Sequence, residues 1–162
     1  VIESDILKII DGYNPDLIIK ACDPELGFRV HLNNICFKKR IPFFHMSYSY
    51  ERINLGPFFM PGKTSCDNYT NSFVMNNFGS DFDFLQHKKL FSFYTVHPST
   101  PFIINLLSNY AFIDLLFYFL EKFELIKSFG KIVYIYPLTM HSFSRKLQCE
   151  KSCYCQSLIN NI

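Results

Sequence analysis

The stretch from Ile53 to Cys66 constrains the fold of this chain more than any other. It reads INLGPFFMPGKTSC, with two turn-forming pairs, Gly56-Pro57 and Pro61-Gly62, on either side of three bulky apolar residues. Such a short apolar run cannot make a helix, so it predicts one buried strand, Phe58–Met60, bounded by turns. The second turn then places the thiol of Cys66 just beyond the strand.

The composition is that of one folded domain. The chain has 162 residues, of which 49% are hydrophobic and 19% charged, which excludes a disordered chain or a nucleic-acid tail. A net charge of +2 indicates no nucleic acid or other polyanion as partner. The first five residues are acidic and no small-residue cleavage site follows, so no secretory signal is predicted. We therefore expect a cytoplasmic chain with reduced thiols, in which clustered cysteines indicate a metal before a disulfide.

The segments before this stretch read as alternating helices and strands. Asp5–Gly12 has the pattern of an amphipathic helix, and residues 17–22 form a short apolar run that suits a parallel strand buried on both faces. Helical spacing follows over Phe28–Lys39, and residues 42–48 read as the next strand, with His45 as a half-buried, hydrogen-bonded side chain.

The later segments contain one long apolar helix. Residues 101–125 have a helix start at Thr100-Pro101 and a stop at residues 128–130. Because polar residues interrupt it, we expect a helix buried on most sides, in the core or at a dimer interface, and no membrane span. Lys131–Tyr136 is the last predicted strand, and one domain is expected over 1–162, with a flexible crossover loop at about 67–99 and a cysteine-containing tail at about 139–162.

Four motifs follow one another along the chain: a strand ending at Asp23, a helix with Arg29, Asn33 and then Cys36, the strand Ile-Pro-Phe-Phe from residue 41, and the Gly-Pro to Cys66 turn. Their order resembles that of the ThiF/MoeB/HesA family, the ubiquitin-activating-type adenylyltransferases. From residue 17 onward the chain resembles the second half of that fold. The resemblance implies an α/β, Rossmann-like three-layer sandwich, and an enzyme that uses ATP and magnesium to adenylate a carboxylate of a small protein or peptide.

The first half of such a fold is not visible in the sequence. The glycines stand at positions 12, 27, 56, 62, 79 and 130, so no G-x-G-x-x-G can be written. That motif forms the turn which cradles phosphates in folds of this type. Either the chain is the C-terminal part of a longer protein or the ATP site has been lost. We favour the first, and expect this segment alone to be inactive.

Asp23 is the candidate nucleotide-site residue. It leaves the carboxyl end of a predicted strand, where open parallel sheets bind ligands, and a carboxylate there can hold magnesium. The residues alone favour an N-cap or turn role, because Pro24 follows. The resemblance instead implies that Asp23 contacts magnesium and ATP, and that Arg29 and Asn33 hold the Asp23 loop in place. The alternative for Arg29 and Asn33 is that they lie on a solvent-exposed helix face. No catalytic residue is assigned.

One cysteine after the Pro61-Gly62 turn and three near the C-terminus make a candidate zinc site. Relatives of the family hold structural zinc with two Cys-x-x-Cys pairs, whereas here Tyr69 replaces the second cysteine of the first pair. Zinc prefers four closed ligands. The residues that can supply them are Cys66, Cys149, Cys153 and Cys155, with His141 as a spare. A degenerate site without metal remains the alternative.

Three functions follow from these observations. The resemblance implies an adenylyltransferase whose partner is a small carrier protein or precursor peptide, and which pairs as a homodimer. The second is a non-catalytic leader-peptide-binding partner of a cyclodehydratase, in the maturation of ribosomal peptides such as bacteriocins. A Rossmann-like oxidoreductase fragment is disfavoured, because no nicotinamide-handling motif is present.

Overall fold

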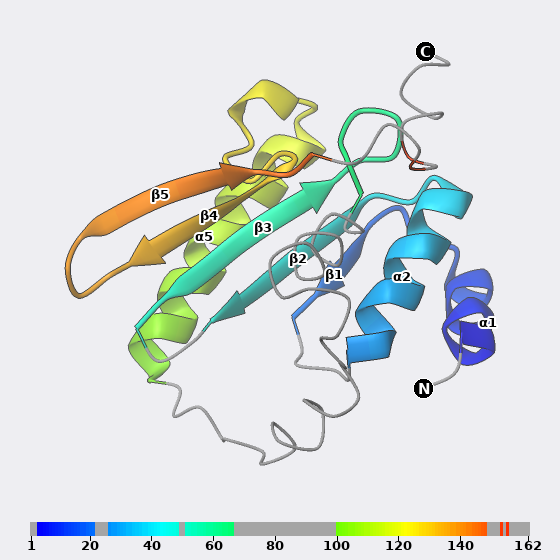
Figure 1. Ribbon diagram of the computed structural model, residues 1–162, viewed down its shortest axis with the longest axis horizontal. Coiled ribbons are helices and arrows are strands. Elements are labelled where there is room, and N and C mark those ends of the chain that lie inside the picture. Colours follow the sequence, from blue (N-terminus) through cyan, green and yellow to red (C-terminus); the bar gives the residue numbers. More distant parts are fainter. Residues whose placement is uncertain are drawn as a thin grey trace, which may run out of the picture.

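A computed structural model describes residues 3–21, 26–48, 51–66, 100–148, 153 and 155, which build a five-stranded sheet with helices on both faces (Figure 1). The strand order follows the chain, β1-β2-β3-β4-β5. In chain order the elements are α1 (Glu3–Tyr13), β1 (Ile18–Lys20), α2 (Leu26–Lys39), β2 (Phe43–Tyr48), β3 (Ile53–Phe59), α5 (Pro101–Phe119), the 3-10 helix η1 (Phe123–Leu125), β4 (Lys131–Tyr136) and β5 (His141–Lys146).

The sheet is mixed. β1 pairs in parallel with β2, and the three remaining pairings are antiparallel. A parallel pair needs a crossover connection, which α2 supplies. Among the described strands β1 and β5 are the two edges. The prediction of a β1 buried on both faces is wrong here, because Ile19 is 44% exposed at this edge.

Two hydrophobic cores lie on opposite faces of the sheet, since successive side chains of a strand point to opposite sides. Phe43 and Phe59 pack with α1 and α2, and their rings stack at 5.6 Å. Phe44 and Phe58 pack with α5, and their rings stack at 5.2 Å. The molecule therefore has three layers, which confirms the predicted α/β sandwich.

Helix α1 lies against α2 and covers the edge of the first core. Ile6 and Ile10 are buried as the helical pattern predicts, whereas Ile9 is 60% exposed. His31 on α2 is 3.2 Å from the carboxylate of Glu3 on α1, so a polar contact also joins the two helices.

Strand β3 is longer than predicted. It starts at Ile53 and contains Gly56-Pro57, joined by a cis peptide bond, inside the strand instead of in a turn. Gly56 has a φ of +88°, and a Cβ there would stand 2.4 Å from the Cβ of Ser128. Gly56 therefore allows the segment around Ser128 to approach the backbone of β3 closely, and it does not reverse the chain. The second predicted turn is confirmed, because the N–H groups of Lys63 and Thr64 both donate to the carbonyl of Met60.

Helix α5 starts where predicted and ends earlier. The Thr100 hydroxyl accepts a hydrogen bond from the N–H of Ile103, which is an N-cap. The helix stops at Phe119, and η1 follows. Its buried residues form one stripe, while the exposed ones include several large apolar side chains. Within the described part of this chain, burial of most sides in the core is therefore wrong, and burial at a dimer interface stays a prediction. The buried stripe consists of Ile103, Leu107, Ala111 and Asp114.

By length and composition alone, α5 is apolar enough to cross a membrane, a property that core helices share.

The tail holds a strand that the sequence pattern does not predict. Residues 141–146 form β5, which pairs antiparallel with β4 along its full length. His141, the spare metal ligand, lies in this strand opposite Tyr136.

Candidate functional site

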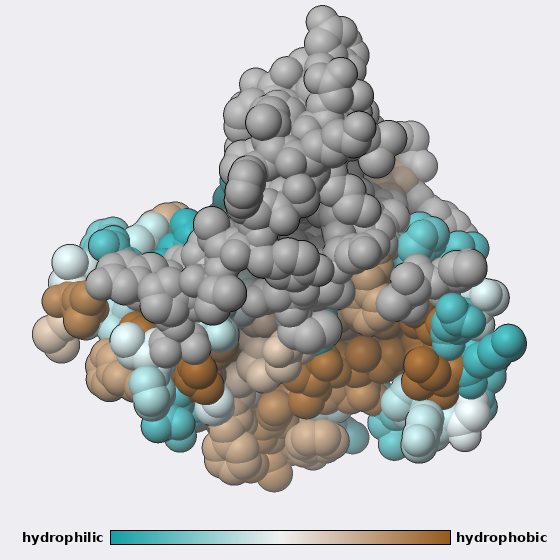
Figure 2. Space-filling model, turned by 90° about the horizontal axis from the view of Figure 1, so that it is seen from below, coloured by the Kyte–Doolittle hydropathy of each residue, from teal (hydrophilic) through white to brown (hydrophobic). Residues whose placement is uncertain are grey.

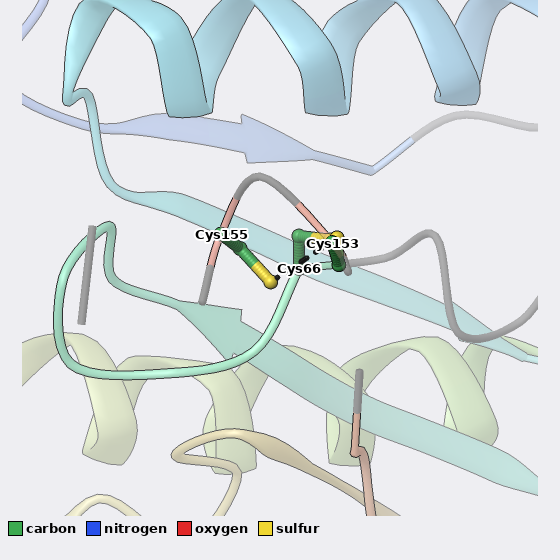
Figure 3. A group of neighbouring side chains, drawn as sticks. All are labelled: Cys66, Cys153 and Cys155. Carbon is green, nitrogen blue, oxygen red and sulfur yellow. Dashed lines mark hydrogen bonds between the residues drawn. The ribbon is translucent and has the colours of Figure 1, made fainter. Parts of the chain in front are cut away.

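Three cysteines meet at the exit of β3 (Figure 3). Cys66 follows the turn after β3, whereas Cys153 and Cys155 belong to the segment after β5. Two hydrogen bonds bring that segment back. The Ser65 hydroxyl donates to the carbonyl of Leu147 at 2.7 Å, and the N–H of Leu147 donates to the carbonyl of Gly130 at 3.0 Å.

The dimensions of this cysteine cluster suit a metal ion. The Sγ atom of Cys153 lies 3.4 Å from those of Cys66 and Cys155, and all three sulfur atoms are within 4.8 Å of one another. Tetrahedral zinc with Zn–S bonds of about 2.3 Å sets its sulfur atoms about 3.8 Å apart. Cys66 and Cys155 are buried, Cys153 is half-buried, and all three are reduced.

The structure thus brings together three of the four predicted metal ligands. Cys149 lies outside the described residues, so the fourth position stays a prediction. Buried thiolates need a compensating positive charge. A zinc ion in the cluster would supply it and would tie the C-terminal segment to the sheet.

Cys36 behaves differently from the cluster, although it is buried in the same core. It is fully buried in α2, and burial raises the pKa of its thiol to about 12, with its own backbone hydrogen bond acting in the opposite direction. A thiol with such a pKa is neutral at physiological pH and is a poor nucleophile or metal ligand. Cys36 is therefore a core residue.

The predicted nucleotide-site residues are described only in part. Asp23 lies outside the described residues, and of Arg29 only the backbone, in α2, is described. Asn33 is 1% exposed, and its amide group donates to the side-chain oxygen of Asn34 at 3.4 Å. A solvated helix face is therefore wrong for Asn33, while the nucleotide role of all three residues stays a prediction.

Two buried basic side chains stand where the parallel pairing of β1 with β2 ends, at the carboxyl end of β1. Lys20 of β1 pairs in register with His45 of β2, and each side chain is 6% exposed. Ligands of open α/β sheets bind outside this end of the strands. Lys20 is not among the site residues predicted from the sequence. The signal that could have identified it is a lysine within an otherwise apolar strand.

An apolar groove of about 390 Å³ runs between α1 and the outer edge of β1. Ile9 and Tyr13 of α1 and Ile19 of β1 line it and are exposed. In Figure 2, which views the molecule from below, hydrophobic residues gather across the lower middle of the visible surface. The groove has no chemistry of its own, but it lies where a further strand would extend the sheet.

Comparison with solved structures identifies the fold of this chain. No protein-family model matches the chain, and no curated protein sequence matches it. The crystal structure of E. coli MccB with ATP has a TM-score of 0.74 at 19% identity, over 97% of this chain and 44% of that one. The microcin C7 biosynthetic enzyme MccB in complex with N-formylated MccA has a TM-score of 0.74 at 20% identity, over 95% and 44%.

A heterocyclase in complex with substrate and cofactor gives a TM-score of 0.63 at 15% identity, over 96% of this chain and 23% of that one. The chain thus spans less than half the length of the MccB chains it resembles. At these identities the likeness concerns the fold alone, and it confirms the α/β fold class expected from the sequence.

Proposed function

We propose that this chain is the second half of a ThiF/MoeB/HesA-type adenylyltransferase that acts with ATP and magnesium on a carboxylate of a small protein or peptide. The observation that carries the proposal is the likeness, over nearly the whole chain, to MccB structures that hold ATP and MccA. The four motifs that resemble this family support it, as does the cysteine cluster at the exit of β3. The MccA complexes further support a peptide as partner.

In this reaction a carboxylate oxygen of the peptide attacks the α-phosphorus of ATP, and the bond from that phosphorus to the leaving pyrophosphate breaks. Catalysis rests on in-line positioning and on neutralising the phosphate charge. Asp23 is the residue we assign to holding magnesium, which supplies part of that neutralisation when bound. Arg29 and Asn33 would hold the Asp23 loop on α2.

The phosphate-binding turn has to be supplied from outside the residues seen here, because the sequence contains no G-x-G-x-x-G. The edge of β1 is the place for it. No described strand pairs with the outer side of β1, and the apolar groove beside it carries exposed Ile9 and Ile19. A parallel strand laid along this edge would cover the groove, and its carboxyl end would stand next to Lys20.

We further propose that the exposed side of α5 forms a homodimer interface. Phe112 and Phe119 are 65% and 69% exposed, and Phe102 is 56% exposed on the same helix. Large exposed apolar patches of this kind mark interaction sites. Light scattering at micromolar concentration should give twice the chain mass, and Phe112→Asp should reduce it to the mass of one chain. A wild-type protein of single-chain mass would count against the dimer.

Exchange of radiolabelled pyrophosphate into ATP tests the proposed reaction in the natural protein. Exchange should require both magnesium and the peptide partner. Asp23→Asn should lower its rate by about 10²–10³-fold, the usual cost of losing one charge-stabilising contact. Asp16→Asn is the matched control, because Asp16 is an exposed carboxylate at the other end of β1, and it should exchange normally.

A non-catalytic leader-peptide-binding partner of a cyclodehydratase is the second candidate. The likeness to a heterocyclase in complex with substrate and cofactor favours it. The two candidates give opposite results in the exchange assay. Peptide binding without any exchange, or normal exchange in the Asp23→Asn variant, would remove Asp23 from the reaction and favour the binding partner.

A further inference from the structure

The three cysteines of the cluster differ in exposure and in position. Cys153 is half-buried, whereas Cys66 and Cys155 are 2% and 1% exposed. The Sγ atom of Cys153 is also the shared one, because it lies 3.4 Å from that of Cys66 and 3.4 Å from that of Cys155 (Figure 3). A small oxidant in solution therefore reaches Cys153 first, and a second thiol already stands in contact with the sulfur that it oxidises.

Thiols in contact can pass from oxidation to a disulfide without a change of fold. A peroxide converts an accessible thiol to a sulfenic acid, which condenses with a neighbouring thiol to form a disulfide. Two pairs offer such a contact here. Cys66 and Cys153 come from segments 87 positions apart in the chain that the fold has brought together, whereas a bridge from Cys153 to Cys155 would close a short, stiff loop. The Cys66–Cys153 pair is therefore the favoured one.

The surroundings of the cluster suit a disulfide as well as a metal ion. Cys66 and Cys155 belong to the core that Phe43 and Phe59 form with α1 and α2, and Cys153 packs against it. A buried thiolate there needs the positive charge of a metal, whereas a disulfide is neutral and needs none. Formation of the disulfide would also remove two of the thiolates that zinc requires. The cluster therefore has two forms compatible with an apolar core, one with zinc and one with a disulfide.

We propose that Cys66 and Cys153 form a reversible disulfide in response to peroxide, which makes the cluster a site of oxidative modification. In the first step the sulfur of Cys153 attacks one oxygen of hydrogen peroxide, the O–O bond breaks, and the sulfenic acid and one water form. In the second step Sγ of Cys66 attacks that sulfur, the S–O bond breaks, and a second water leaves. The two thiols together give up two electrons and two protons, and the peroxide takes up both pairs.

The disulfide would join the turn after β3 to the C-terminal segment. Two hydrogen bonds already bring this segment to the sheet, one from the Ser65 hydroxyl to the carbonyl of Leu147 and one from the N–H of Leu147 to the carbonyl of Gly130. The segment therefore stays attached in both forms, and the metal content is what changes on oxidation. In a reducing compartment such a disulfide is transient and acts as a redox sensor. The modification is independent of the proposed adenylation and goes beyond it.

Disulfide mapping in the natural protein tests the proposal. The reduced protein, freed of reductant, is treated with hydrogen peroxide both as purified and after removal of zinc by a chelator, and is then alkylated and digested with trypsin. Cleavage after Lys63 and Lys151 places Cys66 and Cys153 in different peptides, so mass spectrometry of the unreduced digest detects the cross-link. Cys155→Ser and Cys153→Ser are the matched variants, because each removes one thiol of the cluster but only the second removes the more exposed one.

Wild type and Cys155→Ser should give the cross-link from Cys66 to the peptide that starts at Ser152, and dithiothreitol should remove it. Zinc bound beforehand should leave with the same time course, which a chromophoric chelator measures. Cys153→Ser should cross-link at least about 10-fold more slowly, since exposure governs oxidation, and the buried Cys36 should stay reduced in every sample. A bridge within the Ser152 peptide, sulfinic acid without a cross-link, or equal rates in the two variants would overturn the proposal.

Discussion

Asp114 and Ser128 join the apolar helix α5 to the centre of the sheet. Oδ2 of Asp114 accepts one hydrogen bond from the N–H of Ser128 at 3.0 Å and another from its hydroxyl at 2.5 Å, while Oδ1 accepts from the N–H of Lys127 at 2.8 Å. The carbonyl of Ser128 in turn accepts from the N–H of Phe58 on β3. Asp114 is fully buried, so this carboxylate is a structural element of the fold.

Replacing Asp114 by alanine should destabilise the protein by about 3 kcal/mol, because the two buried donors of Ser128 and the part-buried N–H of Lys127 lose their acceptor at once. Urea unfolding measures this change. Asn109→Ala on the exposed side of the same helix should cost less than about 0.5 kcal/mol. Ser128→Ala combined with Asp114→Ala should show strong coupling, and additive effects of the two substitutions would contradict a shared network.

Two glycines should respond in opposite ways to alanine. Gly56→Ala should destabilise the protein strongly, because the new Cβ would lie 2.4 Å from Ser128 and φ is +88°. Gly12→Ala should stabilise it by up to about 1 kcal/mol, since Gly12 is helical with nothing within 4 Å of its Cβ position. Thermal unfolding of both variants checks the pair, and a tolerated Gly56→Ala would show that β3 and the 128–131 segment are farther apart.

The cysteine cluster should hold close to one zinc ion per chain after reduced, metal-replete purification. Elemental analysis measures the content, and Cys66→Ser and Cys153→Ser should each lower it. Cys36→Ala is the matched control, since Cys36 lies in the same core but outside the cluster, and it should keep its zinc. A zinc-free wild type would leave the three thiols without a metal role.

Burial of Cys36 should make the protein less stable in alkali. Its pKa is about 12 in the folded state against 9.0 for an ordinary cysteine. Above pH 9 the unfolded chain releases this proton and the folded chain does not. The free energy of unfolding therefore falls, by about 1.4 kcal/mol per pH unit at most, until the pH reaches the folded pKa. Below pH 9 this thiol adds no pH dependence.

Unfolding of wild type and Cys36→Ala by urea at pH 8, 9 and 10 isolates the effect from other titrations. The difference in stability between the two proteins should shrink as the pH rises. A difference that stays constant from pH 8 to pH 10 would show that the Cys36 thiol ionises freely in the folded protein.

The sequence predicted those elements whose pattern is set locally. The strand over Lys131–Tyr136 and the start of the helix at Thr100 follow from apolar periodicity and a capping residue, and both are confirmed. The family resemblance predicted which thiols meet, although the cysteine spacing departs from the family pattern, and Cys66, Cys153 and Cys155 do meet. The family resemblance predicted the layer order.

The misses depend on contacts between distant segments. Gly56-Pro57 was expected to be a turn, but the approach of Ser128 places it inside β3. The edge strand over His141–Lys146 was missed, because nearly all of it is exposed and no apolar alternation marks it. Whether the core or a partner chain covers α5 could not be predicted, because composition shows how apolar a helix is and not what covers it.

The nucleotide products formed with the natural protein, its peptide partner and magnesium-ATP test the central claim most directly. Phosphorus NMR distinguishes the possibilities, because attack at the α-phosphorus releases pyrophosphate and leaves AMP on the peptide carboxylate. We predict one pyrophosphate for each AMP group, counted as peptide-bound AMP plus AMP freed by its hydrolysis, with both lost on removal of the peptide. Release of ADP and phosphate, or ATP left intact while the peptide is bound, would contradict the assignment of this chain to an adenylyltransferase.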